Sequence, residues 1–400
     1  LQTKEEIKDV VKSVDVNGKE FVKIDSSKSK DSSNVAGIKE KQKKSDSLAY
    51  KFIDSANTKS TIIAEKLKGK RITILITGVD SRLGTTSKHA DANHLLKIWL
   101  DEGKIEIISI PRGTPADAGF EPNDTIDYNY LANVRANRGR NIYFDEICRI
   151  ADVKKIDYYV EFGFSQALGL IELLGYKNNA VQMLRMLRSR KGFGIGDYQR
   201  VYNQGQFIRQ MLLKMFPIVS GGAGNLILQG GLYLVETNLS YSIVNQIIDR
   251  LKEKGFPKNE NDVLLHVKPK MNTDFLKYDF ANKSSRDSLY TIVQKTTEKN
   301  QKNKKPVKEE NISNNVAGKL REAINSVQAD TLKNPKKIIS KLSIFFEQRA
   351  WYQVSDSSQR NKIRKDICTL LSKAYQSTKN PGQAKYIQQL NETEEKLLNR

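Results

Sequence analysis

The chain contains no run of roughly 18 or more apolar residues, the length that a membrane-spanning helix needs. The sequence therefore predicts no transmembrane helix within its 400 residues. It begins with Leu1 rather than Met. We expect from this that a signal peptide or membrane anchor has been trimmed from a longer precursor.

Cysteine is also scarce, with only Cys148 and Cys368, far apart in the chain. Each lies in an apolar helical pattern, so two buried free thiols are the first interpretation and one long-range disulfide is the alternative. Two cysteines do not indicate a redox compartment. Zinc-ligand, RNP and helix-turn-helix signatures of nucleic-acid-binding proteins are missing as well.

Acidic residues are outnumbered, since 46 Asp and Glu face 67 Lys and Arg and leave a formal charge of +21. Such an excess favours anionic partners: nucleic acid, anionic lipid, pyrophosphate or an acidic polymer. Because no recognition signature accompanies the lysines, we expect no specific nucleic-acid partner. The hydrophobic content of 38% is low for a wholly globular chain.

Composition divides the chain into four parts. Residues 1–69 are rich in Ser and Lys, cannot bury enough apolar surface to fold alone, and are predicted to form a flexible polar tether. Residues 70–268 alternate between strand and helix patterns. Residues 269–316 turn polar again and are predicted to be a charged linker. Residues 317–400 carry helical patterns typical of a small all-α domain.

The alternating patterns in the second part predict an α/β fold with helices on both faces of a sheet. The predicted strands lie in residues 72–80, 93–103, 104–113, 155–164 and 263–269. The predicted helices lie in residues 141–153, 165–176, 198–216 and 241–255, followed in the C-terminal part by 319–332, 336–354, 360–376 and 383–398.

Two aspartates are candidate cation ligands. Asp80 ends the buried strand of the motif TGVDSR, at the strand end where α/β sheets bind ligands. Asp91 follows in HADAN, just before the next predicted strand. Two carboxylates on one strand-loop-strand connection could share one Mg²⁺, with waters and phosphate oxygens as its other ligands. Ordinary turn formation is the alternative interpretation.

Four arginines are candidate phosphate contacts. Arg112 ends the strand of SIPRGT, and Arg188 and Arg190 share a face if their segment is extended. Arg200 and Gln204 lie four residues apart on one helix face. Guanidinium groups bind phosphate oxygens in a bidentate manner and keep their charge, so this set suits a pyrophosphate. A solvated basic face is the alternative.

Taken in this order, the motifs resemble the LytR–CpsA–Psr family over about residues 70–268. The matching pieces are GVDSR at 78–82, SIPR at 109–112, the strand and helix of 156–175, Arg188-Ser189-Arg190, Asp197 with Arg200 and Gln204, and TNLS at 237–240. The resemblance implies an α-β-α sandwich with a central mixed sheet. It also implies an enzyme outside the cytoplasmic membrane, tethered by the trimmed N-terminal segment.

The resemblance further implies a role for each matched residue. Asp80 and Asp91 would hold Mg²⁺. Asp80, Asp91, Arg112 and Arg190 would be catalytic. The pyrophosphate of a polyprenyl-linked glycan would be bound by Arg82, Arg112, Arg188, Arg190, Arg200 and Gln204. The reaction would be a phosphotransfer of the glycopolymer to peptidoglycan at the membrane surface.

The sequence departs from the family pattern near Asp91. Where the family usually has R-S-D-T, this chain has His89, Ala90, Asp91 and Ala92, and Asn203 replaces a common arginine. Protonated His89 would partly substitute for the arginine; a plain loop residue is the alternative. Two functions follow: an active phosphotransferase or pyrophosphatase, or a degenerate scaffold that binds lipid pyrophosphate, peptidoglycan or a protein partner of the C-terminal helices.

Overall fold

The computed structural model describes residues 13–14, 20–21, 67, 69–81, 83–121, 127–190, 193–221, 224–300, 309–328 and 334–398. The chain forms two compact units, Leu1–Tyr50 and Lys51–Arg400. The first contains an antiparallel pair of short strands, β1 (Ser13–Val14) and β2 (Glu20–Phe21). The predicted tether of residues 1–69 lies almost wholly outside the described residues.

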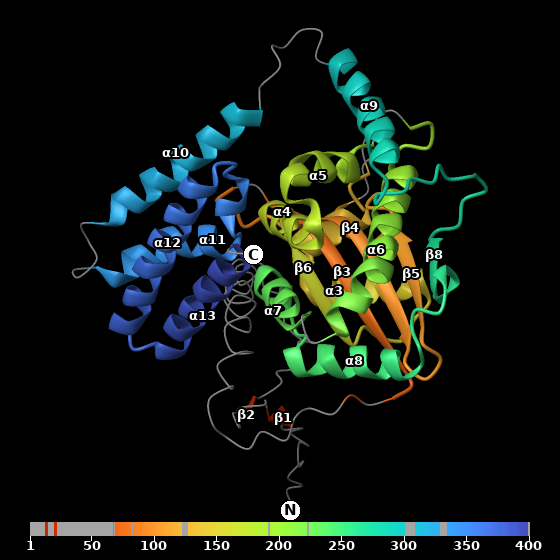
Figure 1. The fold of residues 1–400 in the computed structure, drawn as a ribbon, viewed down its shortest axis with the longest axis horizontal. Helices are drawn as coiled ribbons and strands as arrows, with labels where there is room; N and C mark the ends of the chain where they lie inside the picture. Colours follow the sequence, from red (N-terminus) through yellow and green to blue (C-terminus); the bar gives the residue numbers. More distant parts are fainter. Residues whose placement is uncertain are drawn as a thin grey trace, which may run out of the picture. The chain divides into compact units, whose positions relative to one another are not determined.

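A six-stranded mixed sheet forms the centre of the second unit, with the order β7-β6-β3-β4-β5-β8 (Figure 1). β3, β4 and β5 form an antiparallel meander, while β6 joins β3 and β8 joins β5 in parallel. The strands are β3 (Arg71–Asp80), β4 (His89–Trp99), β5 (Lys104–Ile110), β6 (Tyr158–Phe162), β7 (Glu236–Thr237) and β8 (Val263–Val267).

Helices cover both faces of this sheet. Leu75, Leu95 and Ile108 pack in one cluster against α2 (Leu131–Asn137) and α3 (Gly139–Ala151). The alternate strand residues, such as Ile74, Leu96 and Ile107, pack on the other face against α6 (Asp197–Val219) and α8 (Tyr241–Glu253). Successive side chains of a strand point to opposite faces of the sheet, so each apolar strand contributes residues to the hydrophobic cores on both faces. The predicted α-β-α sandwich with a mixed sheet is confirmed.

Further helices complete the part of the chain that contains the sheet. They are α4 (Phe164–Ile171), η1 (Glu172–Tyr176), η2 (Lys177–Asn179), α5 (Ala180–Arg188), α7 (Asn225–Leu234), η4 (Glu260–Asp262) and α9 (Lys283–Asn300). Of these, α5, α7 and α9 were not predicted. The first is only nine residues long, the second contains two glycines, and the third is polar and falls within the predicted linker. Short or weakly apolar helices carry little periodic signal.

The C-terminal part is helical, as predicted. It consists of α10 (Glu309–Gln328), α11 (Pro335–Glu347), η5 (Ala350–Gln353), α12 (Ser357–Ser377) and α13 (Pro381–Leu398). The single helix predicted for residues 336–354 is wrong. Arg349 has a left-handed backbone with φ of 51°, which ends α11 and turns the chain into η5.

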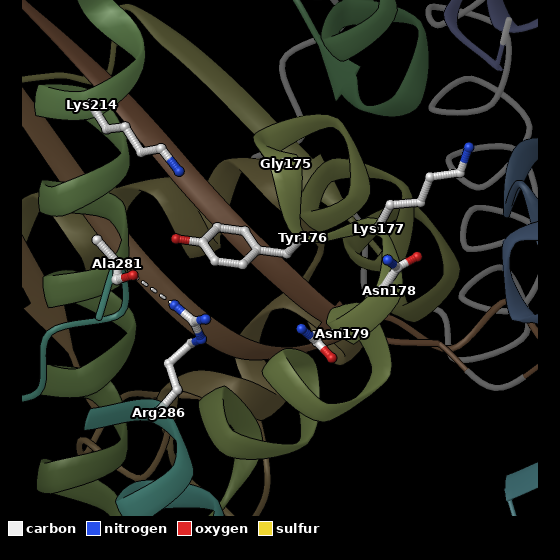
Figure 2. A pocket seen from close by; sticks show the side chains of 8 residues that line it. All are labelled: Gly175, Tyr176, Lys177, Asn178, Asn179, Lys214, Ala281 and Arg286. Carbon is white, nitrogen blue, oxygen red and sulfur yellow. Dashed lines mark hydrogen bonds between the residues drawn. The ribbon is translucent and has the colours of Figure 1, made fainter. Parts of the chain in front are cut away.

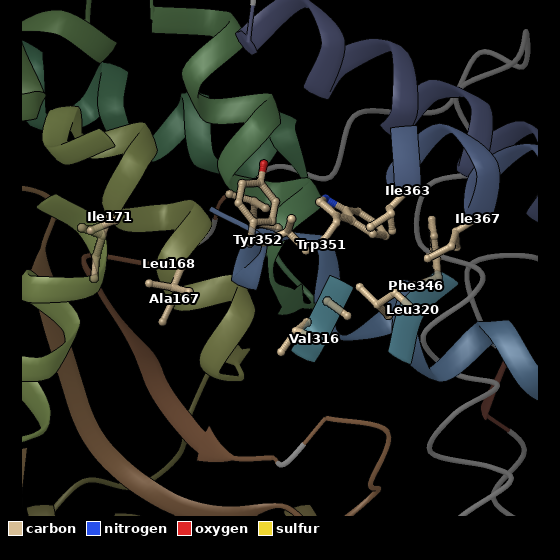
Figure 3. Packing of buried hydrophobic residues seen from close by; sticks show 14 of the residues in the cluster. Ala167, Leu168, Ile171, Val316, Leu320, Phe346, Trp351, Tyr352, Ile363 and Ile367 are labelled. Carbon is tan, nitrogen blue, oxygen red and sulfur yellow. The ribbon is translucent and has the colours of Figure 1, made fainter. Parts of the chain in front are cut away.

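The break at Arg349 brings η5 onto the α/β part. Figure 3 shows Tyr352 of η5 on the side of Leu168 of α4, and Trp351 with its ring directed toward Ile363, within one hydrophobic cluster. Gly169 permits this approach, because a Cβ there would lie 3.0 Å from the Tyr352 ring. The C-terminal helices therefore share a continuous core with α4, α5 and α9.

Two further expectations concern thiols and the membrane. Cys148 and Cys368 are both free cysteines, as the first interpretation predicted, but only Cys368 is buried and Cys148 is partly exposed. Burial raises the pKa of the Cys368 thiol to about 12. No helix in the described part of the chain combines the length and apolar character needed to span a bilayer.

Candidate functional site

The two candidate aspartates lie on adjacent strands. Asp80 is the last residue of β3, and Asp91 is the third residue of β4, rather than a loop residue before that strand as predicted. The β3–β4 pairing joins Val79 to Ala90 but Gly78 to Ala92. Asp91 is therefore the extra residue of a β-bulge, which redirects side chains and is common beside functional sites.

The bulge decides which way Asp91 points. Ala90 and Leu95 pack in the same core beneath α2 and α3, although they are five positions apart in the chain. A regular strand would place them on opposite faces. The extra residue of the bulge lets both side chains point to the same face. The backbone carbonyl of Asp91 accepts a hydrogen bond of 3.2 Å from Arg200 Nη2 on α6. Asp91 thus belongs to the arginine-bearing side of the sheet edge.

Three arginines converge on Asp91. Arg112, directly after β5, forms an ion pair with Asp91 Oδ1. Arg188, the last residue of α5, places Nη2 4.0 Å from Asp91 Oδ2 and 3.5 Å from Asp80 Oδ1. With the contact from Arg200, guanidinium groups from three separate segments meet at one bulged aspartate. Fixed cations gathered in this way suit a phosphate-bearing ligand.

Arg200 is the most buried cation of this group, with 4% of its side chain exposed. Its Nη2 lies 2.6 Å from Asp197 Oδ1, one turn earlier on α6. Burial lowers the pKa of Arg200, whereas Asp197 and Asp91 raise it; Arg190 and Arg112 lower it further through charge repulsion. An arginine keeps its charge under such shifts, so this position supplies fixed positive charge.

Gln204 links the helices and the strand beneath the arginines. Its Nε2 donates to the Leu187 carbonyl at 2.8 Å, and its side chain also interacts with buried His94. His94 Nδ1 lies 2.8 Å from Ser109 Oγ, and a Cβ on Gly205 would lie 2.5 Å from that same oxygen. Only glycine therefore lets α6 approach β5 this closely and hold Arg200 over Asp91.

The other residues that the sequence pointed to differ in how close they lie to Asp91. Arg190 is exposed and close enough to lower the pKa of Arg200 by repulsion. Arg188 ends a helix and so does not lie in the fully extended segment that was predicted. His89 Nδ1 lies 3.0 Å from Asn133 Oδ1 of α2. Arg82 lies outside the described residues.

The loop between Asp80 and Asp91 is held at two points. The side chain of Gln348 accepts from the Gly84 amide and donates to the Thr85 carbonyl, each at 2.9 Å. At the other end, Lys88 Nζ lies 2.9 Å from Glu161 Oε1 and 2.5 Å from Glu236 Oε2. The C-terminal helices thus contribute directly to the position of this loop.

Glu161 is the carboxylate that binds Lys88 at the second of these two points. Burial alone would raise its pKa, but Lys88, Arg135 and Arg140 together hold the pKa well below the usual range of a glutamate. Arg135 binds it with two hydrogen bonds of 2.8 and 3.1 Å. A carboxylate paired with several cations keeps β6 and the end of the loop fixed.

Sequence reasoning missed two supporting residues. The guanidinium carbon of Arg188 lies 5.1 Å from the ring centroid of Phe164, a cation–π contact that orients Arg188. Gln348 lies 264 residues after its partner Gly84, directly after α11, in the part of the chain that was predicted to be a separate helical domain. Phe164 was part of the recognised strand-helix motif, whereas nothing in local sequence marked Gln348.

The residues around Asp91 fit Mg²⁺ only as a two-carboxylate site. Asp80 and Asp91 both lie within 4.0 Å of one guanidinium nitrogen of Arg188, so this arginine holds the point that a shared Mg²⁺ would take. Within the described ranges, no group of three or more His, Cys, Asp or Glu side chains could hold a metal. Mg²⁺ is commonly bound by one or two carboxylates with waters and phosphate oxygens completing the shell.

Comparison with known proteins gives one sequence match. Residues 18–175 match the sequence model of the LytR_cpsA_psr family. The match includes Asp80, Asp91 and Arg112 and ends before Arg188 and Arg200. No curated protein matches the chain.

Several solved structures are similar in shape. Protein gbs0355 from Streptococcus agalactiae is 17% identical with a TM-score of 0.41, and the match covers 56% of this chain and 88% of that one. TagV from B. subtilis is 15% identical with a TM-score of 0.40, covering 57% and 98%. TagT bound to LIIa-WTA is 15% identical with a TM-score of 0.37, covering 60% and 97%.

Proposed function

We propose that the chain is a phosphotransferase of the LytR–CpsA–Psr kind. Residues 18–175 match that family, whose members transfer glycopolymers to the cell wall outside the cytoplasm. Its substrate would be a glycopolymer on a polyprenyl pyrophosphate at the membrane surface, and its acceptor a peptidoglycan hydroxyl. The observation that supports this most directly is the convergence of Arg112, Arg188 and Arg200 on Asp91.

The reaction needs charge stabilisation more than covalent chemistry. An acceptor oxygen bonds to the transferred phosphorus while the bond from that phosphorus to the bridging oxygen breaks and polyprenyl phosphate leaves. Arg188 and Arg112 would neutralise charge that develops on the leaving group. Arg200, buried and fixed, would hold the pyrophosphate from the α6 side, and exposed Arg190 would close the opposite side.

The two aspartates suit different tasks. The Asp91 side chain is 17% exposed and already paired with Arg112, so it orients the arginines. The Asp80 side chain is 40% exposed and contacts Arg188 at 3.5 Å. Asp80 is therefore the better candidate to accept the proton of the attacking hydroxyl. If Mg²⁺ is bound by these two carboxylates, it would add positive charge against the phosphate oxygens.

The experiment measures release of polyprenyl phosphate from a short-chain polyprenyl pyrophosphate glycan with Mg²⁺ and peptidoglycan fragments. Arg188→Gln should lower turnover by roughly ten- to a hundredfold, because one charge-assisted contact contributes about 1.5–3 kcal/mol. Arg321→Gln is the matched control, since Arg321 is an exposed arginine on α10 far along the chain. Equal turnover in the Arg188 variant and the wild type, or none in the wild type, contradicts the proposal.

A second candidate is a scaffold that binds the lipid pyrophosphate without turning it over. Two observations favour it: Asp91 is already neutralised by arginines, and His89, which replaces the usual arginine, pairs with Asn133. Binding of the analogue without product in the same assay, lost in Arg188→Gln, would identify this function.

A further inference from the structure

A separate basic cavity lies at the end of α5 remote from Arg188. It has a volume of about 310 Å³ and is lined mainly by η1, η2, α6 and the start of α9 (Figure 2). Lys214 follows Arg200 by 14 residues on α6, which is about 21 Å at the helical rise of roughly 1.5 Å per residue. The cavity is therefore distinct from the arginine cluster around Asp91.

The cavity lining is cationic. Lys177, Lys214 and Arg286 all line it. Among the residues that the structure describes, no carboxylate forms an ion pair with any of the three. The nearby acid Asp279 is held in its own turn, where it accepts hydrogen bonds from the amides of Ala281 and Asn282 at 2.8 and 3.2 Å.

Tyr176 holds two of these cations in place. Lys214 Nζ lies 5.1 Å from its ring centroid, and the Arg286 guanidinium carbon lies 5.6 Å from it. The Tyr176 hydroxyl donates to the Phe280 carbonyl at 3.2 Å, which fixes the ring. Burial raises the pKa of Tyr176, Arg286 opposes this and Asp279 adds to it, so the phenol is neutral at physiological pH.

Arg286 is oriented by backbone contacts on one side only. Its Nη1 donates to the carbonyls of Phe280 and Ala281 at 2.7 and 2.8 Å. Figure 2 shows the guanidinium directed beneath the Tyr176 ring, with the Asn179 side chain facing it and Lys214 approaching from α6. Lys177 points away from this group. Two cations on opposite sides of the Tyr176 ring and one amide thus line the same cavity.

We propose that this cavity is a binding site for the phosphate group of a small molecule, with Lys214 and Arg286 as its charged contacts and Asn179 as an amide donor. An arginine fork with an adjacent lysine suits phosphate oxygens. The volume is near the lower end of small-molecule sites, which span roughly 300–1,000 Å³. The site does not depend on the proposed transferase activity.

Calorimetric titration of the whole chain at constant ionic strength tests this, with inorganic phosphate, glycerol 3-phosphate and citrate as probes. Lys214→Gln should weaken phosphate binding by roughly tenfold, because a charge-assisted contact is lost. Lys214 makes no hydrogen bond among the described residues that this change would break, so the variant should fold normally. Lys319→Gln, an exposed lysine on α10, is the matched control and should bind within about twofold of wild type.

The arginine cluster around Asp91 also attracts phosphate, so position must be measured as well as affinity. Crystals of the whole chain soaked in tungstate should show an anomalous peak within hydrogen-bonding distance of Lys214 and Arg286. A peak at the Asp91 cluster alone overturns the proposal, as do equal losses in the Lys214 and Lys319 variants, or citrate binding without phosphate binding. If glycerol 3-phosphate binds more tightly than inorganic phosphate, the ligand of the cavity is an organic phosphate. If the two bind equally, the ligand is free phosphate.

Discussion

Arg188 Nη2 lies 3.5 Å from Asp80 Oδ1, although the two residues are 108 positions apart in the chain. One end of α5 meets the end of β3, and the same guanidinium also approaches Asp91 on β4. Phe164 lies under the guanidinium and supports it. The pair therefore joins two strands and two helices at the edge where the ligand would bind.

Replacing Arg200 should affect stability as well as function. Arg200→Ala leaves Asp197 without its 2.6 Å partner and removes the hydrogen bond to the Asp91 carbonyl. We expect the free energy of unfolding to fall by about 2–3 kcal/mol, since the lost interactions are charge-assisted and mostly buried. Urea unfolding measures this. Arg321→Ala, at an exposed position, should change stability by less than about 0.5 kcal/mol, and an equal loss there would contradict the assignment.

Gln348→Ala tests whether the C-terminal helices position the loop after Asp80. The change removes both hydrogen bonds to Gly84 and Thr85. Because these bonds are exposed, stability should fall by only about 0.5–1.5 kcal/mol. Turnover should fall by a larger factor, roughly tenfold, through loss of orientation of Asp80.

The control for that change is Gln388→Ala, at an exposed glutamine on α13. The discriminating measurement is the division between kcat and KM. Loosening of Asp80 lowers kcat, whereas a general loss of folded protein lowers the apparent enzyme concentration in proportion to stability. A kcat unchanged per folded molecule would show that Gln348 has no positioning role.

His94 should make stability depend on pH in the acid range. Burial lowers its pKa to about 4 from 6.5; the neighbouring Gln204 side chain opposes this shift, and the charge of Arg200 adds to it. Between these values the unfolded chain binds more protons than the folded one. The contribution of His94 to the free energy of unfolding should therefore rise as pH rises from about 4 to about 6.5, by roughly 3 kcal/mol.

Urea unfolding at several pH values, compared between wild type and His94→Gln, measures that contribution. The free energy of unfolding of the wild type minus that of the variant should rise by roughly 3 kcal/mol as pH rises from about 4 to about 6.5. His266→Gln is the matched control, because its side chain is 53% exposed. If both histidine variants keep the wild-type slope, His94 is not held neutral by burial.

Glu394 should act in the opposite direction. It is buried beside Trp351, whose Nε1 donates to it at 3.0 Å, and burial raises its pKa to about 7 against the opposing charges of Arg349 and Arg364. The folded chain then binds more protons than the unfolded one between about pH 4.5 and 7. The contribution of Glu394 to stability should fall across this window as pH rises, by up to roughly 3 kcal/mol.

Glu394→Gln keeps an acceptor for Trp351 and removes the charge, so its stability should gain on wild type as pH rises to 7. The matched control is Glu392→Gln, at an exposed position two residues before Glu394 on α13, and this variant should not show the gain. The contributions of His94 and Glu394 oppose each other in the wild type, so only the difference between variant and wild type reports each one. Parallel pH curves for Glu394→Gln and wild type would contradict the raised pKa.

Part of the site was readable from local sequence. Asp80 follows a buried β-branched strand, and strand ends carry ligand residues in α/β sheets. Arg200 and Gln204 occupy one helix face because they are four residues apart. The direction of Asp91 was not readable, since it depends on the bulge between β3 and β4. The extra residue appears only when both strands are paired.

The sequence by itself determined the alternation of strands and helices, the mixture of buried and solvated faces, and the helical nature of residues 317–400. Apolar periodicity is a local property, so each element carries its own signal. Only the tertiary structure decided that Arg112, Arg188 and Arg200 meet at Asp91, and that Gln348 holds the loop beside Asp80. These contacts join segments that are far apart in the chain, and they depend on which helices pack together. The apolar faces of the helices look alike in sequence, so the pairing of helices is determined only when the shared core around Trp351 forms.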